Sequence, residues 1–183
     1  MAEQLDGLAE LSAALGALSS VYGARGLFRE REQVALRRLR LSQDSRFDDV
    51  RERVNILHQA GAALAYVGEY TAAMPHLLEA ERLGGQIQAV DQQIAALRYQ
   101  SECWYFLDRW DRVLEIEEKW RALQKRYPHF FERVGAMCFQ VSLSASIHAR
   151  RGEFERARLL REESFALMVA AEPPEAWGRD NHY

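Results

Sequence analysis

A short pattern occurs four times in this chain, at intervals of about forty residues. Each copy has a turn residue followed two positions later by an aromatic residue: Gly26-x-Phe28, Gly68-x-Tyr70, Asp108-x-Trp110 and Gly152-x-Phe154. The turns are 42, 40 and 44 residues apart. Seven positions before each turn stands a small residue: Ser19, Gly61, Ser101 or Ala145. A fixed period in this range predicts a solenoid, in which each repeat packs mainly against its neighbours.

Between the turns, apolar residues recur every three or four positions, as in Leu5, Leu8 and Leu11, and strict alternation is absent over any useful length. This spacing predicts helices and no strands. We therefore expect an all-α chain of eight helices paired as four antiparallel hairpins, which form one repeat domain over residues 1–171. The expected hairpins cover residues 4–42, 46–83, 88–126 and 130–170, and residues 172–183 form a tail or linker.

The turn residues have a specific task in this scheme. A residue just past the end of a helix commonly adopts the left-handed conformation, which glycine reaches without strain and Asp108 tolerates better than most residues. The small residues would let the two helices of a hairpin approach closely. The aromatic residue after each turn is expected to fill the wedge between them. Pro75 falls early in an expected helix, where it costs little in the first turn and kinks the helix if it lies deeper.

Composition excludes several classes of function. The chain has 183 residues, 48% of them hydrophobic, which is enough for a packed core. Its net charge of −3 provides no basic field for nucleic acid. No apolar run is long enough to span a membrane. Glu3 and Asp6 stand where a signal peptide would need positive charge, so we expect a cytoplasmic protein.

Residues that carry chemistry are present but scattered. The five histidines form no metal-ligand pair, and His148 falls on the packed side of its helix. Cys103 and Cys138 each lie in an apolar helical segment, where cysteine behaves as a small hydrophobe. The arginine-rich stretch Arg29–Arg40 has the spacing of an exposed helix face. We expect no catalytic site, no cofactor and no metal.

The repeats resemble the tetratricopeptide repeat family. The second copy matches best, through Leu57, Gly61, Leu64, Gly68, Tyr70, Ala73 and Ala80. The resemblance covers residues 5–170, although the period exceeds the ~34 residues usual for the family. It implies a right-handed superhelix with a concave groove that binds a protein or peptide. The long helices are also similar to repeat regions of large bacterial transcriptional regulators. By register with the family, the groove residues are Asn55, His58, Ala62, Tyr66, Arg98, Glu102, Tyr105, Ser142, Ser146 and Arg150.

Three further interpretations stay open. The module could instead be a sensor that binds a small effector or peptide in the groove, where Arg98 and Arg150 would hold a carboxylate. In the aromatic segment CWYFLDRW, Trp104 and Trp110 suit a core, whereas Tyr105 and Phe106 pack on the next repeat or line a partner surface. The end of the stack is expected to leave Phe165, Leu167 and Met168 partly uncovered, which favours a homo-oligomer.

Overall fold

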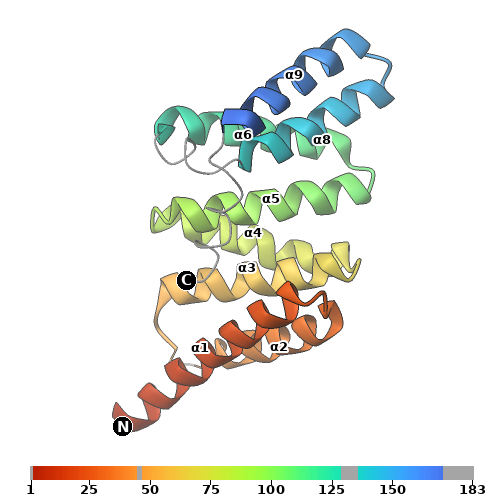
Figure 1. Cartoon of the computed structure of the whole chain (residues 1–183). Helices are drawn as coiled ribbons and strands as arrows, with labels where there is room; N and C mark the ends of the chain where they lie inside the picture. The colour runs from red at the N-terminus through yellow and green to blue at the C-terminus, as the bar shows by residue number, and fades with distance from the viewer. Residues whose placement is uncertain (1, 45–46, 129–135, 171–183) are drawn as a thin grey trace. The chain divides into compact units, whose positions relative to one another are not determined.

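The computed structural model describes residues 2–44, 47–128 and 136–170, and these residues form eight helices and no strand (Figure 1). The helices are α1 (Ala2–Ala24), α2 (Phe28–Leu41), α3 (Val50–Tyr66), α4 (Tyr70–Gln86), α5 (Val90–Phe106), α6 (Trp110–Arg126), α8 (Ala136–Arg150) and α9 (Phe154–Ala170). The chain divides into two compact units, Met1–Cys103 and Trp104–Tyr183, so the boundary falls within α5. The all-α prediction is confirmed for the described residues.

The helix boundaries lie close to the predicted ones, and the start of α3 is the informative difference. Helix α3 begins at Val50 because Asp49 caps it: the Asp49 carboxylate accepts a hydrogen bond from the Glu52 backbone N–H at 3.0 Å. Helix α4 continues through Pro75. The proline nitrogen cannot donate to the Thr71 carbonyl, but both residues are exposed, so water can reach that carbonyl. The predicted helix start at 130–135 and the tail at 172–183 lie outside the described residues.

The four predicted turns share one geometry. Gly26, Gly68, Asp108 and Gly152 all have positive φ, between 56° and 85°. In each turn this residue donates to the carbonyl three positions earlier, and the next residue donates to the carbonyl five positions before it. These two bonds define the capping motif that satisfies the last carbonyls of a helix. Gln88, with φ of 56°, makes the same pair of bonds between α4 and α5, at a turn that was not predicted.

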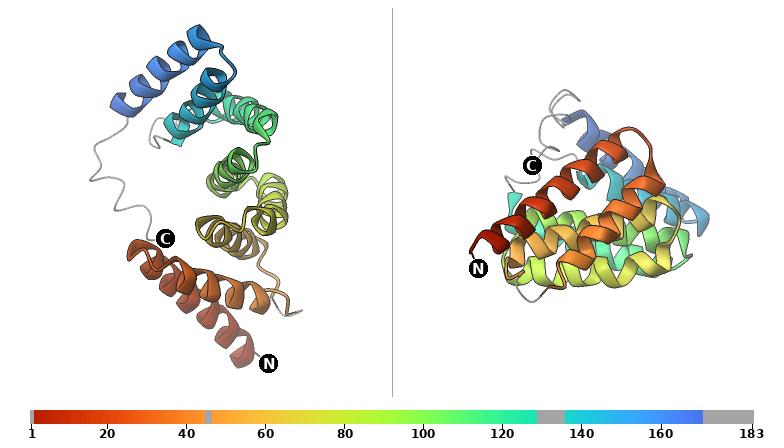
Figure 2. Two further views of the ribbon diagram at one scale, coloured as in Figure 1. Left: turned by 90° about the vertical axis from the view of Figure 1, so that its right-hand side faces the viewer. Right: turned by 90° about the horizontal axis from the view of Figure 1, so that it is seen from below.

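In the first unit, α1 packs against α2 and α3 against α4, and both hairpins are visible in Figure 2. A Cβ added to Gly61 would lie 2.5 Å from Leu77 Cγ, so glycine is what allows α3 and α4 to come this close. Val54, Ala80 and Ala96 form a buried cluster from α3, α4 and α5. The prediction that small residues permit close helix pairing is therefore confirmed at Gly61.

One buried polar network joins the first three helices. Arg38 on α2 is 3% exposed, and its guanidinium donates to Ser12 Oγ at 3.0 Å, Gln59 Oε1 at 2.6 Å and Glu52 Oε1 at 2.5 Å. Gly16 makes room for it, since a Cβ there would lie 2.9 Å from Arg38 Cζ. The expectation of an exposed Arg29–Arg40 face is wrong at Arg38. Its partners come from α1 and α3, which spacing along α2 alone does not reveal.

The second unit contains α6, α8 and α9, with α8 packed against both of the others. The buried face of α6 consists of Val113, Ile116 and Trp120. Gln140 on α8 donates a hydrogen bond from Nε2 to the Val113 carbonyl at 3.1 Å. Arg121 on α6 makes two parallel bonds to Glu163 on α9, at 2.9 and 3.0 Å. This two-pronged pair fixes α9 relative to α6.

Two of the aromatic residues that follow the turns make contact with another hairpin. Phe28 stacks on Tyr66 at the end of α3, and Trp110 lies under Arg150 at the end of α8. These contacts reach the first helix of the following hairpin. Phe154 has no such helix among the described residues and is 72% exposed, so the prediction for it is wrong.

Candidate functional site

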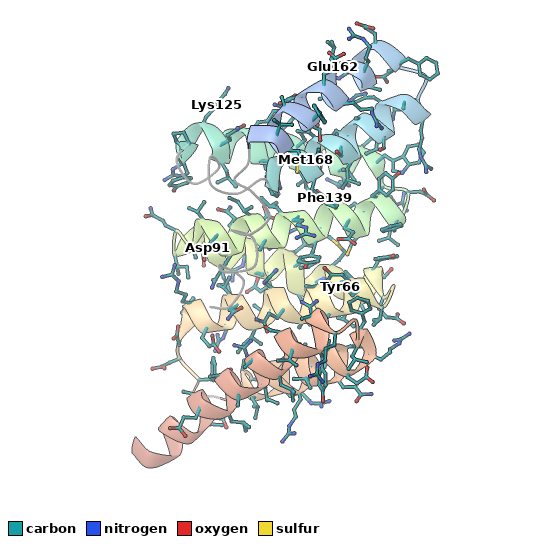
Figure 3. The ribbon with its side chains drawn as sticks, in the orientation of Figure 1. Tyr66, Asp91, Lys125, Phe139, Glu162 and Met168 are labelled. Atoms are coloured by element: carbon teal, nitrogen blue, oxygen red, sulfur yellow. The ribbon has the colours of Figure 1, made fainter. Side chains whose placement is uncertain are left out.

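Six side chains from α2, α3 and α5 gather at one place in the first unit: Phe28, Arg31, His58, Tyr66, Arg98 and Tyr99. We call them the tyrosine–arginine cluster. Tyr66 stands at its centre, at the C-terminal end of α3 (Figure 3). The Phe28 ring stacks on it with centroids 5.0 Å apart, and Arg31 Cζ lies 4.8 Å from its centroid. Both contacts come from the first turn of α2.

Tyr99 on α5 forms the second half of the cluster. Its ring meets Tyr66 edge-on at 5.8 Å, and its hydroxyl donates to the Tyr66 hydroxyl at 3.4 Å. His58, two turns before Tyr66 on α3, lies 5.5 Å from the Tyr99 ring. Arg98 Cζ lies 5.2 Å from the same ring. The cluster therefore combines aromatic faces with two guanidinium groups.

The electrostatic field of the cluster is positive. Burial together with the charges of Arg31 and Arg98 lowers the pKa of His58 to about 4, and the Asp91 carboxylate opposes this shift only in part. His58 is therefore neutral near pH 7. Burial, aided by the neighbouring Tyr66, raises the pKa of the Tyr99 hydroxyl, which keeps its proton and can donate it in a hydrogen bond.

Two nitrogen atoms in the cluster are buried without a hydrogen-bond partner among the described residues. They are His58 Nε2 and Arg31 Nε. A buried polar atom without a partner costs free energy comparable to a lost hydrogen bond, so folded proteins generally avoid it. Both nitrogens are themselves buried, so the part of the cluster open to an external group is the exposed ring of Tyr66.

A smaller aromatic–arginine contact lies in the second unit. The Arg150 guanidinium lies 5.7 Å from the Tyr105 ring centroid and 5.6 Å from the Trp110 ring. Phe106 meets Tyr105 edge-on and is 55% exposed. Trp104 and Trp110 are only half-buried, so neither is the core tryptophan of this unit. That position belongs to Trp120, which is fully buried.

The remaining predicted site residues have mainly local partners. Asn55 Nδ2 donates to Glu52 at 3.4 Å. The Ser142 hydroxyl pairs with Ser164 at 2.7 Å, and Ser146 donates to the Ser142 carbonyl at 3.0 Å. Burial raises the pKa of Glu102, and Arg98 opposes the shift. Ala62 is fully buried and is not available to a partner, so its assignment to the groove is wrong.

Sequence reasoning placed His58, Tyr66 and Arg98 in the site, and the structure brings these three together. Phe28, Arg31 and Tyr99 were not among the predicted site residues. Phe28 and Arg31 lie on α2, the second helix of a hairpin, whereas the family register assigns groove residues to first helices. The stacking of Phe28 on a residue 38 positions later needs the packing of two hairpins to be known.

The histidines and cysteines of the described part of the chain have separate surroundings. No three His, Cys, Asp or Glu side chains come together there as a metal site. Cys103 is fully buried, and burial with the nearby Glu102 raises the pKa of its thiol to about 12. His148 is buried as predicted, and its Nδ1 lies 2.7 Å from Glu153 Oε2. Among the described helices, none has the length and apolar content needed to cross a bilayer.

Models of known protein families give no match to this chain, and neither do curated proteins. The tetratricopeptide resemblance therefore rests on the residues quoted above and stays a prediction.

Proposed function

We propose that this chain is a non-enzymatic protein-interaction module and that its partner binds at the tyrosine–arginine cluster. In this proposal the hairpins are tetratricopeptide-like repeats that stack as a right-handed superhelix. The identical capping of four turns spaced 40 to 44 residues apart supports a repeated unit.

The observation that carries the proposal is the 38% exposed ring of Tyr66, which a partner can reach and which lies among Phe28, Arg31 and Tyr99. Tyrosine and arginine dominate the residues that contribute most to protein–protein binding. An acidic side chain from the partner would suit the guanidinium of Arg31 beside this ring. The positive field of Arg31 and Arg98 would attract it.

The resemblance to repeat regions of large bacterial regulators supports a setting in the cytoplasm, as part of a signalling or transcriptional protein. There, a module of this kind would hold a regulatory partner through aromatic and arginine contacts. The net charge of −3 gives no support to direct contact with nucleic acid.

A capture experiment tests this proposal. Immobilised wild-type protein, the double variant Arg31→Met with Tyr66→Ala, and the control Leu78→Ala would each be incubated with extract of the native host. Leu78 is 46% exposed and lies on α4 outside the cluster. We expect mass spectrometry to show at least one protein retained by wild type and control and lost from the double variant.

Two results would contradict the proposal. One is equal retention of every captured protein by all three forms, with circular dichroism showing unchanged folding. The other is capture of no protein at all while a small anionic compound binds wild type and not the double variant. That second result would establish the sensor interpretation instead.

A further inference from the structure

Helices α1 and α9 each present an apolar face to solvent. On α1 the large exposed residues are Leu11, Leu18 and Val21, with exposed fractions of 37 to 46%. On α9, Phe165 is 63% exposed, Met168 55% and Val169 66% (Figure 3 labels Met168). The prediction that Phe165, Leu167 and Met168 are partly uncovered is confirmed: Phe165 and Met168 are exposed and Leu167 is half-buried.

The α1 face corresponds to one that is buried in other first helices. Ala14, Leu18 and Val21 stand twelve, eight and five residues before the turn at Gly26. The same positions before Gly68 and Gly152 are buried throughout: Ile56, Ala60, Ala63, Gln140, Ser144 and Ile147. Gln140 shows what covers that face, because it donates to the Val113 carbonyl on the second helix of the preceding hairpin.

The α9 face corresponds to one that meets the next first helix. Phe165 and Met168 stand thirteen and sixteen residues after the turn at Gly152, as Glu81 and Gly84 do after Gly68. On α4, Glu81 accepts a hydrogen bond from Gln100 of α5 at 2.9 Å.

Gly84 on α4 makes the second contact with α5. A Cβ added there would lie 3.4 Å from the backbone nitrogen of Gln93.

The two faces are matched halves of one interface. Gln100 and Gln93 stand eight and fifteen residues before the turn at Asp108, and the residues at those positions on α1 are Leu18 and Leu11. The α4–α5 register therefore places Phe165 opposite Leu18 and Met168 opposite Leu11. In place of the Gln100–Glu81 hydrogen bond and the close approach of Gly84 to Gln93, this register brings exposed apolar side chains together.

We propose that a second copy of this chain covers α9, with its α1 packed on α9 in the register that α4 and α5 use. Phe165 then contacts Leu18 of the second copy, and Met168 contacts Leu11. The contact joins unlike surfaces, so each dimer still presents one free α1 face and one free α9 face. Assembly therefore continues beyond two copies as concentration rises.

Sedimentation velocity on the full chain and on three single variants, Phe165→Glu, Leu18→Glu and the control Leu78→Glu, tests the proposal. We expect wild type and control to grow in mass with concentration, and each face variant alone to remain monomeric. An equimolar mixture of Phe165→Glu and Leu18→Glu should form dimers and stop there, because only one intact face remains on each copy. Circular dichroism checks folding, since all three positions are exposed.

Three results would overturn it. Wild type that stays monomeric at all concentrations would show that the two faces do not bind each other. A Leu18→Glu variant that dimerises alone would indicate that α9 packs on α9. A mixture of the two face variants that remains monomeric would exclude the head-to-tail contact. None of these results depends on the tyrosine–arginine cluster.

Discussion

The guanidinium of Arg38 on α2 donates to the carboxylate of Glu52 on α3 across 2.5 Å, and the arginine is almost fully buried. Ser12 also donates to the same Glu52 oxygen, at 2.8 Å, so α1, α2 and α3 share one acceptor. A buried guanidinium whose three nitrogen atoms each donate a hydrogen bond thus joins the first two hairpins. Buried pairs of this kind specify which helices pack together more than they add net stability.

Breaking this pair should be costly. Glu52→Gln leaves the buried Arg38 charge without its counter-ion, and we expect a loss of about 3 kcal/mol in the free energy of unfolding. Arg29→Met removes an exposed pair with Glu32 and should cost less than about 1 kcal/mol. Urea denaturation measures both. Equal effects of the two substitutions would show that Arg38 is solvated in solution.

The close approach of α3 and α4 should make Gly61 intolerant of a side chain. Gly61→Ala places a Cβ 2.5 Å from Leu77 Cγ and 3.3 Å from the Ala73 carbonyl oxygen. We expect a destabilisation of about 1–3 kcal/mol from this overpacking. Gly7→Ala is the matched control, since nothing lies within 4 Å, and it should stabilise α1 by about 0.5–1 kcal/mol. A neutral Gly61→Ala would mean that the hairpin is looser than described.

Substitutions at two of the turns should change the stability of the protein in opposite directions. Asp108 has φ of 56°, so Asp108→Gly relieves backbone strain and should stabilise the protein by up to about 1 kcal/mol. Gly68 has φ of 85°, and Gly68→Val should destabilise it by about 1–2 kcal/mol or more. Thermal melting followed by circular dichroism gives both signs. Stabilisation by Gly68→Val would exclude the left-handed cap at that turn.

The buried His58 should make folding sensitive to acid. Its pKa is lowered to about 4 from an ordinary value of 6.5, so the unfolded chain binds the proton more readily. The contribution of neutral His58 to the free energy of unfolding is fully present above pH 6.5 and is lost as the pH falls towards 4. The loss approaches about 3 kcal/mol by linkage. Burial also lowers the pKa of His76, which adds a change of the same sign.

The test of this prediction is the pH dependence of urea unfolding. His58→Gln should lose less stability than wild type between pH 7 and pH 4, because glutamine does not titrate. If the two proteins lose the same amount, protonation of His58 is not coupled to folding.

The repeated turns were predictable because each depends on a single residue. A left-handed backbone position favours glycine or a residue that tolerates positive φ. The sequence has such a residue at each of these turns: Gly26, Gly68, Asp108 and Gly152. Gln88 adopts the same conformation, but glutamine is not a residue type that indicates positive φ, so this turn could not be predicted from the sequence.

The candidate site was only partly predictable. His58, Tyr66 and Arg98 follow from helix register, whereas Phe28 and Arg31 join them through packing between hairpins. The burial of Arg38 escaped prediction for the same reason. Its counter-ion is fourteen residues away on another helix, a separation that carries no local signal.

The affinity of a partner for cluster variants tests the central claim most directly. With a partner from the capture experiment, isothermal titration calorimetry would compare the Kd of wild type with those of Tyr66→Ala, Arg98→Ala and Tyr105→Ala. Binding at the cluster predicts a loss of about 1–2 kcal/mol for Tyr66→Ala and for Arg98→Ala, which is a Kd roughly 5 to 30 times higher. A comparable loss for Tyr105→Ala would extend the contact to the second unit. Unchanged Kd values for Tyr66→Ala and Arg98→Ala, with folding intact, would contradict the assignment of the cluster as the binding site.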